Sequence, residues 1–426
     1  MSPAPNNLRR VLLYSHDTYG LGHLRRNLAI AKRLLEHRPS LRVLLMTGSS
    51  VAERFPLPRG LMVLRLPPVV KVGAGEYRAR DQRWGFDLAR RARTAIMSDA
   101  AQRFRPDVFL VDHAPQGMKG ELLPVFATLR RTSPGTRIVI GLRDVLDEPA
   151  TVRANWSEQG VYETLESIFD RVLVYGSQDV FDVVGAYGLP PVVAAKLEYC
   201  GYVCRPPAPA PAPSARPEGG PFVLGTAGGG GDGAEVLTAT LAASTALGVR
   251  SLVVTGPLMD AAERFELARR AEQGSRAEVV EFVPDLASAA RQASAVVTMG
   301  GYNTLCEMVS AGVPTVVVPR VHPRREQAIR AELFSQRGAV STVVPGPGLA
   351  ERMEEALAAA LAAGPRQGPS PIDLGGLERL DAAVERTAER HGAERHGPDK
   401  HGPRGRPRQL QREQPRRRRQ RDGRRY

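Results

Sequence analysis

Cysteine, aromatic residues and long apolar runs are all scarce in this sequence of 426 residues. Cys200, Cys204 and Cys306 form no C-x-x-C pair and lack histidines at zinc-binding spacing, so we expect reduced thiols, with a redox pair of Cys200 and Cys204 as the alternative. The apolar runs fall far short of the roughly 20 residues that a membrane-spanning helix needs. No secretory signal pattern precedes the first strand-like segment. These absences predict a cytoplasmic protein.

Positive charge is abundant, and most of it lies at one end of the chain. The formal net charge is +14, and residues 400–426 hold twelve Lys and Arg against Glu413 and Asp422. This low-complexity composition predicts a disordered basic tail over residues 391–426 that contacts anionic polymers. The hydrophobic content of 42% and the length are typical of a globular protein with two domains.

Short apolar runs alternate with amphipathic stretches, which predicts an α/β fold with a mostly parallel sheet in each domain. Proline and alanine dominate residues 206–220, which we expect to form an extended linker because proline cannot donate to a sheet. The same strand and helix pattern occurs on both sides of it. The predicted units are an N-terminal domain (1–205), the linker (206–220), a C-terminal domain (221–375), a helix (376–390) and the tail (391–426).

The strongest motif follows a strand-like segment at residues 295–298. It reads Met299-Gly300-Gly301-Tyr302-Asn303-Thr304 and opens a helix that carries Glu307. Glycines let backbone N–H groups approach a phosphate, and a helix N-terminus adds partial positive charge. The motif therefore predicts a diphosphate-binding loop, followed by a solvent-facing carboxylate at Glu307.

The helix ends at Gly312-Val313-Pro314, and a second strand and loop lead to Glu326-Gln327. In this order the motifs resemble glycosyltransferase family 28, the family of the peptidoglycan N-acetylglucosaminyl transferase. The likeness is closest in residues 282–331 and extends weakly over residues 8–363.

The resemblance implies a fold and a set of donor contacts. The fold is GT-B, with two Rossmann-like domains facing a central cleft, and the donor is a nucleotide diphosphate sugar, with UDP favoured. The resemblance implies contacts to the diphosphate from Gly300, Gly301, Asn303 and Thr304. It implies a contact to the ribose from Glu307, and contacts to the sugar from Glu326 and Gln327.

Further donor contacts are implied on two other segments. A glycine cluster at residues 225–231 follows the first strand of the C-terminal domain, and the resemblance places its Gly228 and Gly229 against the diphosphate. A merely flexible loop is the alternative reading of these glycines. Phe282 and Val283 are expected to meet the nucleotide base.

In the N-terminal domain a loop ending in Gly20-Leu21-Gly22-His23 joins the first strand to the first helix. Open α/β sheets bind ligands at this edge, and a neutral imidazole can take a proton from an acceptor hydroxyl. His23 is the candidate base, with His16 as the alternative. Asp112, at the end of another strand, is the candidate to orient the histidine.

Four residues are candidates for acceptor binding: Gly20, Gly22, Arg143 and Asp144. The acceptor itself is unknown, and lipid-linked or anionic molecules are the candidates. An arginine-rich segment at residues 78–93 contains Trp84 and Phe86, which suggests peripheral contact with the inner face of a bacterial membrane, although a solvated helix would look the same.

The predicted chemistry is an inverting transfer that uses no metal and no cofactor, because the sequence shows no Asp-x-Asp pair in the cleft segments and no clustered His and Cys ligands. Two alternatives remain open. One is a hydrolase or epimerase that acts on the nucleotide sugar, and the other is a protein that binds it without catalysis.

Overall fold

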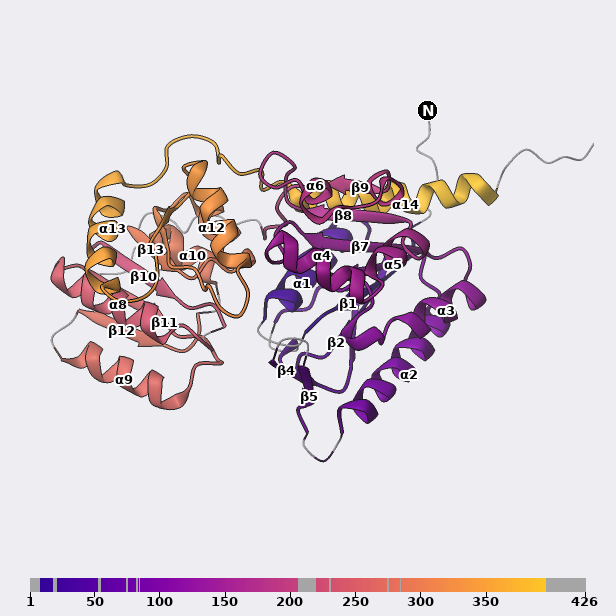
Figure 1. The fold of residues 1–426 in the computed structure, drawn as a ribbon, viewed down its shortest axis with the longest axis horizontal. Coiled ribbons are helices and arrows are strands. Elements are labelled where there is room, and N and C mark those ends of the chain that lie inside the picture. The colour runs from indigo at the N-terminus through magenta and orange to yellow at the C-terminus, as the bar shows by residue number, and fades with distance from the viewer. Residues whose placement is uncertain are drawn as a thin grey trace, which may run out of the picture.

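The computed structural model describes residues 8–17, 21–52, 55–73, 76–81, 83, 85–205, 220–229, 231–273, 276–283 and 285–395. Two parallel sheets, each between layers of helices, form two lobes (Figure 1). The predicted α/β fold with two Rossmann-like domains is confirmed. Gly20, residues 206–219 of the expected linker and the tail beyond residue 395 lie outside the described residues.

The N-terminal sheet has seven strands in the order β3-β2-β1-β6-β7-β8-β9, and all neighbours are parallel. The strands are β1 (Arg10–Ser15), β2 (Arg42–Thr47), β3 (Leu61–Arg65), β6 (Val108–Asp112), β7 (Arg137–Arg143), β8 (Arg171–Tyr175) and β9 (Leu197–Tyr199). An antiparallel hairpin of β4 (Val69–Gly73) and β5 (Glu76–Ala79) lies apart from it. Successive strands are added on one side of β1 up to β3 and on its other side from β6 onward, so the topological switch point lies between β1 and β6.

Both faces of this sheet are buried, which is why its strands read as continuous apolar runs. Val11 and Leu13 of β1 face one core, whereas Leu12 and Tyr14 face the other. The helices of this part of the chain are α1 (Gly22–His37), α2 (Phe86–Phe104), η2 (Met118–Gly120), α3 (Leu123–Thr132), α4 (Pro149–Glu158), α5 (Val161–Ser167), α6 (Val183–Tyr187) and α7 (Pro191–Ala194).

The C-terminal sheet repeats the same plan with the parallel order β12-β11-β10-β13-β14-β15. Its strands are β10 (Phe222–Thr226), β11 (Arg250–Val254), β12 (Ala277–Val280), β13 (Ala295–Thr298), β14 (Thr315–Val317) and β15 (Ser341–Thr342). Its helices are α8 (Ala234–Ala246), α9 (Ala261–Glu272), α10 (Leu286–Gln292), α11 (Tyr302–Ala311), α12 (Glu326–Gln336) and α13 (Leu349–Ala363). The switch point lies between β10 and β13.

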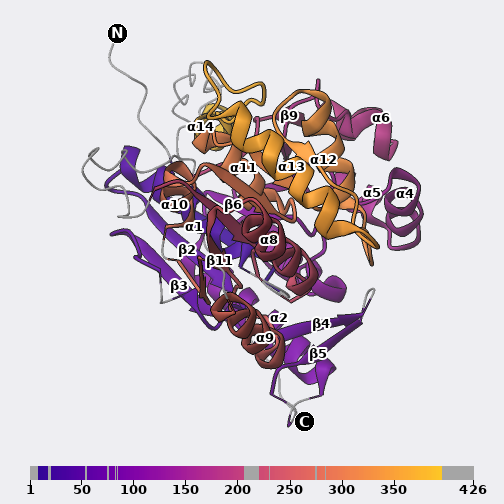
Figure 2. The same ribbon diagram turned by 90° about the vertical axis from the view of Figure 1, so that its left-hand side faces the viewer.

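Helices α8, α9 and α13 cover the outer face of the C-terminal sheet and lie in the foreground of Figure 2. The last helix, α14 (Gly376–Arg395), returns to the N-terminal domain and packs against α1, with Leu380 and Val384 buried in the core that also holds Val11. It extends to Arg395, past the expected end at residue 390. None of the helices in the described ranges has an apolar stretch that could span a bilayer.

Candidate active site

A cavity of about 800 Å³ lies between the two domains, where strands of both sheets end. His23 and His113 line it from the segments that follow β1 and β6. Gly228 and Met299 line it from the segments that follow β10 and β13. The cavity therefore joins the two switch points, where open α/β sheets bind their ligands.

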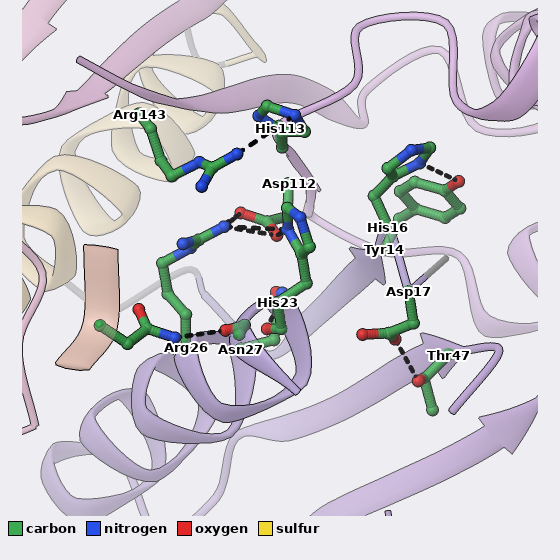
Figure 3. Close-up of polar contacts among 12 residues, drawn as sticks. Tyr14, His16, Asp17, His23, Arg26, Asn27, Thr47, Asp112, His113 and Arg143 are labelled. Carbon is green, nitrogen blue, oxygen red and sulfur yellow. Dashed lines mark hydrogen bonds and ion pairs between the residues drawn. The ribbon is translucent and has the colours of Figure 1, made fainter. Parts of the chain in front are cut away.

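His23 is the second residue of α1, and Asp112 is the last residue of β6. Nδ1 of His23 lies 2.6 Å from Oδ2 of Asp112 (Figure 3). An ionised carboxylate only accepts hydrogen bonds, so we assign the ring proton to Nδ1. In the neutral ring this tautomer leaves Nε2 with a free lone pair, which is what a general base requires.

Arg26 also donates hydrogen bonds to the Asp112 carboxylate, and the sequence analysis did not identify Arg26 as a site residue. Its Nε and Nη2 atoms donate to Oδ1 of Asp112 at 3.0 and 2.8 Å. Burial raises the pKa of the Asp112 carboxyl, but Arg26 and then His23 outweigh it and lower that pKa to about 2. The spacing of three residues between His23 and Arg26 puts both on one helix face, and this was the available signal.

Burial also lowers the pKa values of the histidines that line the cavity. It lowers the pKa of His23, although the neighbouring Asp112 carboxylate opposes the shift. Burial, followed by the charge of His23, lowers the pKa of His16 to about 3. Nδ1 of His16 lies 3.2 Å from the hydroxyl of Tyr14, which donates to Glu121 at 2.7 Å. Both rings are therefore neutral at neutral pH. Of the two, only His23 is hydrogen-bonded to a carboxylate, that of Asp112.

His113 completes a group of three rings, and the sequence analysis did not single it out. Its ring centroid lies 5.0 Å from that of His23 and 6.0 Å from that of His16. The residue has a φ of 70°, which is uncommon outside glycine and here turns the chain directly after β6. Its place directly after Asp112 was the signal in the sequence. In the part of the chain that the structure describes, no three His, Cys, Asp or Glu side chains are grouped to hold a metal ion.

The half of the cavity where we expect the donor begins at the turn between β13 and α11. Gly300 has a φ of 79°, and a Cβ atom there would lie 2.8 Å from Cγ1 of Val317, so glycine is required. Gly301 precedes the first turn of α11, whose Asn303 and Thr304 line the cavity. The amide of Asn303 donates to the carbonyl of Gly22 at 2.6 Å. This bond links the expected donor loop directly to the loop of the candidate base.

The second glycine loop lies against the first. Gly228 has a φ of 64°, and a Cβ atom there would be 3.8 Å from the hydroxyl of Thr304. Gly256, which the sequence analysis overlooked, leaves room for this loop, because a Cβ atom on it would approach the carbonyl oxygen of Gly228 to 2.5 Å. Phe282 and Val283 follow β12 and line the same cavity, with the Phe282 side chain exposed.

Glu307 is not the solvent-facing carboxylate that we expected. It is 4% exposed, and its Oε1 atom accepts from Arg25 of the N-terminal domain at 2.6 Å. The helix pattern predicted the face of α11 correctly, but it could not reveal that α1 would pack against that face. The other oxygen, Oε2, is buried without a partner among the described residues.

In Glu326, as in Glu307, one carboxylate oxygen accepts from an arginine and the other has no partner among the described residues. Its Oε1 atom accepts from Arg320 at 2.7 Å, and its Oε2 atom is buried without a partner in the described chain. Gln327 accepts from the backbone of Arg320 at 3.1 Å, which leaves its side-chain N–H groups to the cavity that it lines. In each of these side chains, one polar atom is hydrogen-bonded within the protein and another is left to contact a ligand.

Asp144 is not an acceptor contact, and this expectation is corrected. The residue is fully buried, where it accepts from Tyr202 at 2.5 Å and pairs with Arg330 of α12 at 3.2 Å. Its backbone position at the end of β7 was read correctly, but its side chain points into the domain interface. Arg143, the residue before it, does line the cavity.

Comparison with known proteins shows which family the C-terminal part of the chain resembles. Residues 228–368 match the glycosyltransferase family 28 C-terminal domain, so the resemblance expected from the motifs is confirmed over this part of the chain. One relative is the UDP-N-acetylglucosamine--N-acetylmuramyl-(pentapeptide) pyrophosphoryl-undecaprenol N-acetylglucosamine transferase of Vibrio parahaemolyticus, 34% identical over 116 residues. That match covers 27% of this chain and 33% of the relative, so the chain spans about a third of the relative's length.

Solved structures share the fold over nearly the whole chain. The structure of Acinetobacter baumannii MurG has a TM-score of 0.54 at 16% identity and covers 90% of this chain and 99% of its own. A variant of Os79 from O. sativa, in complex with UDP, has a TM-score of 0.57 at 16% identity and covers 89% of this chain and 94% of its own. These similarities establish the two-domain GT-B fold.

Proposed function

We propose that this protein is a glycosyltransferase that moves a sugar from a nucleotide diphosphate sugar, with UDP as the favoured nucleotide, to an acceptor hydroxyl. The observation that carries the proposal is the pair of His23 and Asp112, 2.6 Å apart, on the wall of a cavity whose opposite wall is a family 28 domain. A base and a donor loop in one cavity are what a sugar transfer requires.

His23 acts as the general base. Its Nε2 atom takes the proton from the acceptor hydroxyl while the oxygen attacks the anomeric carbon. The bond between that carbon and the diphosphate breaks, and the nucleoside diphosphate leaves with the electron pair. Asp112 holds the ring in the required tautomer and stabilises the imidazolium that forms. Because Asp112 is fully buried behind His23 and Arg26, it is not a nucleophile, and a single displacement inverts the anomeric centre.

The C-terminal domain holds the donor. Backbone N–H groups at Gly228, Gly229, Gly300 and Gly301, with the N-terminus of α11, stabilise the charge of the diphosphate. Oε2 of Glu307 accepts from the ribose, and Oε2 of Glu326 accepts from the sugar, since both atoms are buried without another partner among the described residues. Phe282 and Val283 meet the base.

We also propose that the protein works in the bacterial cytoplasm at the inner face of the membrane, with a lipid-linked acceptor. The relative from Vibrio is bacterial, and its name includes an undecaprenol-linked acceptor. On the surface, Leu88 of α2 is 57% exposed among arginines of the same helix, which suits contact with anionic lipid. Sedimentation with phosphatidylglycerol vesicles tests this, because Leu88→Asp should reduce the bound fraction and an unchanged fraction would overturn the contact.

The catalytic proposal is tested by His23→Gln and His16→Gln, assayed for UDP release from a panel of UDP-sugars with and without acceptors. We expect His23→Gln to lower turnover by about 10²–10⁴-fold, with the Kd for UDP nearly unchanged. Loss of turnover only in His16→Gln would move the base to His16. Release of free sugar by the wild type without any acceptor would instead indicate a hydrolase, and an altered sugar still attached to UDP would indicate an epimerase.

A further inference from the structure

Arginines crowd the cavity, and most of them already have carboxylate partners. Arg25 pairs with Glu307, Arg26 with Asp112, Arg205 with Asp285, Arg320 with Glu326 and Arg330 with Asp144, at 2.6–3.2 Å. Arg143 and Arg324 also line the cavity, yet neither makes an ion pair with any described residue. Two positive charges therefore lie in a partly buried site without a carboxylate in ion-pair contact, although the charges of Glu326 and Asp112 act on Arg143 from farther away.

Arg143 is the deeper of these two charges. It ends β7, its side chain is half-buried, and its Nε atom is buried without a hydrogen-bond partner among the described residues. Burial, with the charges of Arg26 and Arg330, lowers the pKa of the guanidinium to about 10. A half-buried charge without an ion-pair partner is unfavourable for a fold, so its retention calls for an explanation.

His113 lies beside Arg143 with its own unused polar atom. Nη2 of Arg143 is 3.5 Å from Nε2 of His113, too long for a good hydrogen bond, and the two side chains converge in Figure 3. Nδ1 of His113 is buried without a partner within the described chain. The three polar groups, the guanidinium and the two ring nitrogens, stand next to the His23 base, because the rings of His113 and His23 are 5.0 Å apart.

We propose that Arg143 and His113, with Arg324 from the opposite domain, form a binding site for an acidic group of the acceptor, a carboxylate or a phosphate a few bonds from the hydroxyl that is attacked. This inference rests on the proposed function. A guanidinium fork matches either group through two parallel hydrogen bonds. The acceptor anion supplies the direct ion pair that Arg143 lacks among the described residues, and a neutral acceptor does not.

Two of the three residues, Arg143 and His113, place this site on the acceptor side of the cavity, and Arg324 reaches it from the donor side. Arg143 and His113 come from β7 and the end of β6, on the same domain as His23, whereas the glycine loops and the N-terminus of α11 lie across the cavity. The acidic group is thereby held close to the base, and the site selects hydroxyl acceptors by charge.

The test measures binding of two matched pairs of probes by calorimetry, with and without saturating UDP. The pairs are glucuronate with glucose, and glycerol 3-phosphate with glycerol. We expect one or both anions to bind at least tenfold more tightly than the neutral partner, and Arg143→Gln to abolish this preference while Arg143→Lys retains part of it. Arg205→Gln is the matched control, because Arg205 lines the same cavity but is paired with Asp285.

Preference for the carboxylate or for the phosphate identifies which acid the acceptor carries. Equal binding of anionic and neutral probes, or equal loss in Arg143→Gln and Arg205→Gln, would overturn the proposal. Displacement of the anions by UDP would also overturn it, since the charges would then serve the donor. If UDP itself fails to bind, the donor proposal fails, and the anion titrations without UDP still report on Arg143.

Discussion

Asp112 holds two partners at once, the guanidinium of Arg26 and the ring of His23, and both depend on its charge. Asp112→Asn should therefore affect stability and catalysis together. It leaves Arg26 buried without a full partner, which costs about 3–5 kcal/mol of unfolding free energy, and it removes the preference for the productive ring tautomer. Urea unfolding and turnover are the measurements.

The control for this change is Asp99→Asn, which breaks an exposed pair with Arg103 on α2. We expect it to alter the unfolding free energy by less than about 0.5 kcal/mol. An Asp112→Asn variant that is as stable and as active as this control would contradict the assigned role of Asp112.

The pH dependence of kcat/KM follows from the shifted pKa of His23. The base must be neutral to accept a proton, and burial lowers its pKa below the ordinary value of 6.5. Activity should therefore persist to lower pH than for an exposed histidine, so that the acidic limb of the profile has its midpoint below 6.5. A midpoint clearly above this value would mean that another group is the base.

Glu307 offers a test of the donor contact at a single atom. Glu307→Gln should weaken UDP binding by about tenfold or more, because a hydrogen bond to a charged acceptor contributes about 1.5–3 kcal/mol. It should also lower the unfolding free energy, because Arg25 loses its partner. Glu378→Gln, a change at an exposed carboxylate that also lines the cavity, is the calorimetric control, and equal UDP affinities in the two variants would contradict the ribose role.

At the level of elements, the turn between β13 and α11 shows how backbone geometry shapes the proposed donor loop. Gly300→Ala and Gly248→Ala place a side chain at similar positive φ, 79° and 67°, but only the first meets a neighbour. Gly248→Ala should cost about 1–2 kcal/mol from backbone strain alone. Gly300→Ala should cost more and also weaken UDP binding, measured by unfolding and calorimetry, whereas equal effects would show that the turn has no special role.

Elements with a clear pattern of apolar residues were predictable from the sequence. The apolar run of β13, expected at residues 295–298, and the glycine turn before α11 lie where the pattern placed them, because burial on both faces and a tight turn leave local signatures. The partners of the site residues were not predictable. Arg25 and Glu307 are 282 positions apart, and only the packing of α1 on α11 brings them together.

Across the whole molecule, the donor and base loops are joined by contacts that cross the cavity. Asn303 bonds to Gly22, Arg25 pairs with Glu307, and Arg330 pairs with Asp144. These residues have no local signature that predicts an interface, since a charged residue at a strand end reads equally as a ligand contact. The sequence analysis assigned Asp144 to the acceptor for this reason.

The most direct test of the account is thermal unfolding of the full chain with a panel of nucleotides and nucleotide sugars. A ligand that binds only the folded protein stabilises it by about 2.7 kcal/mol at a hundred times its Kd. We predict a clear rise in Tm with UDP and at least one UDP-sugar, and a smaller rise for Glu307→Gln. A folded wild-type protein whose Tm is unmoved by every nucleoside diphosphate and nucleotide sugar would contradict the proposed function.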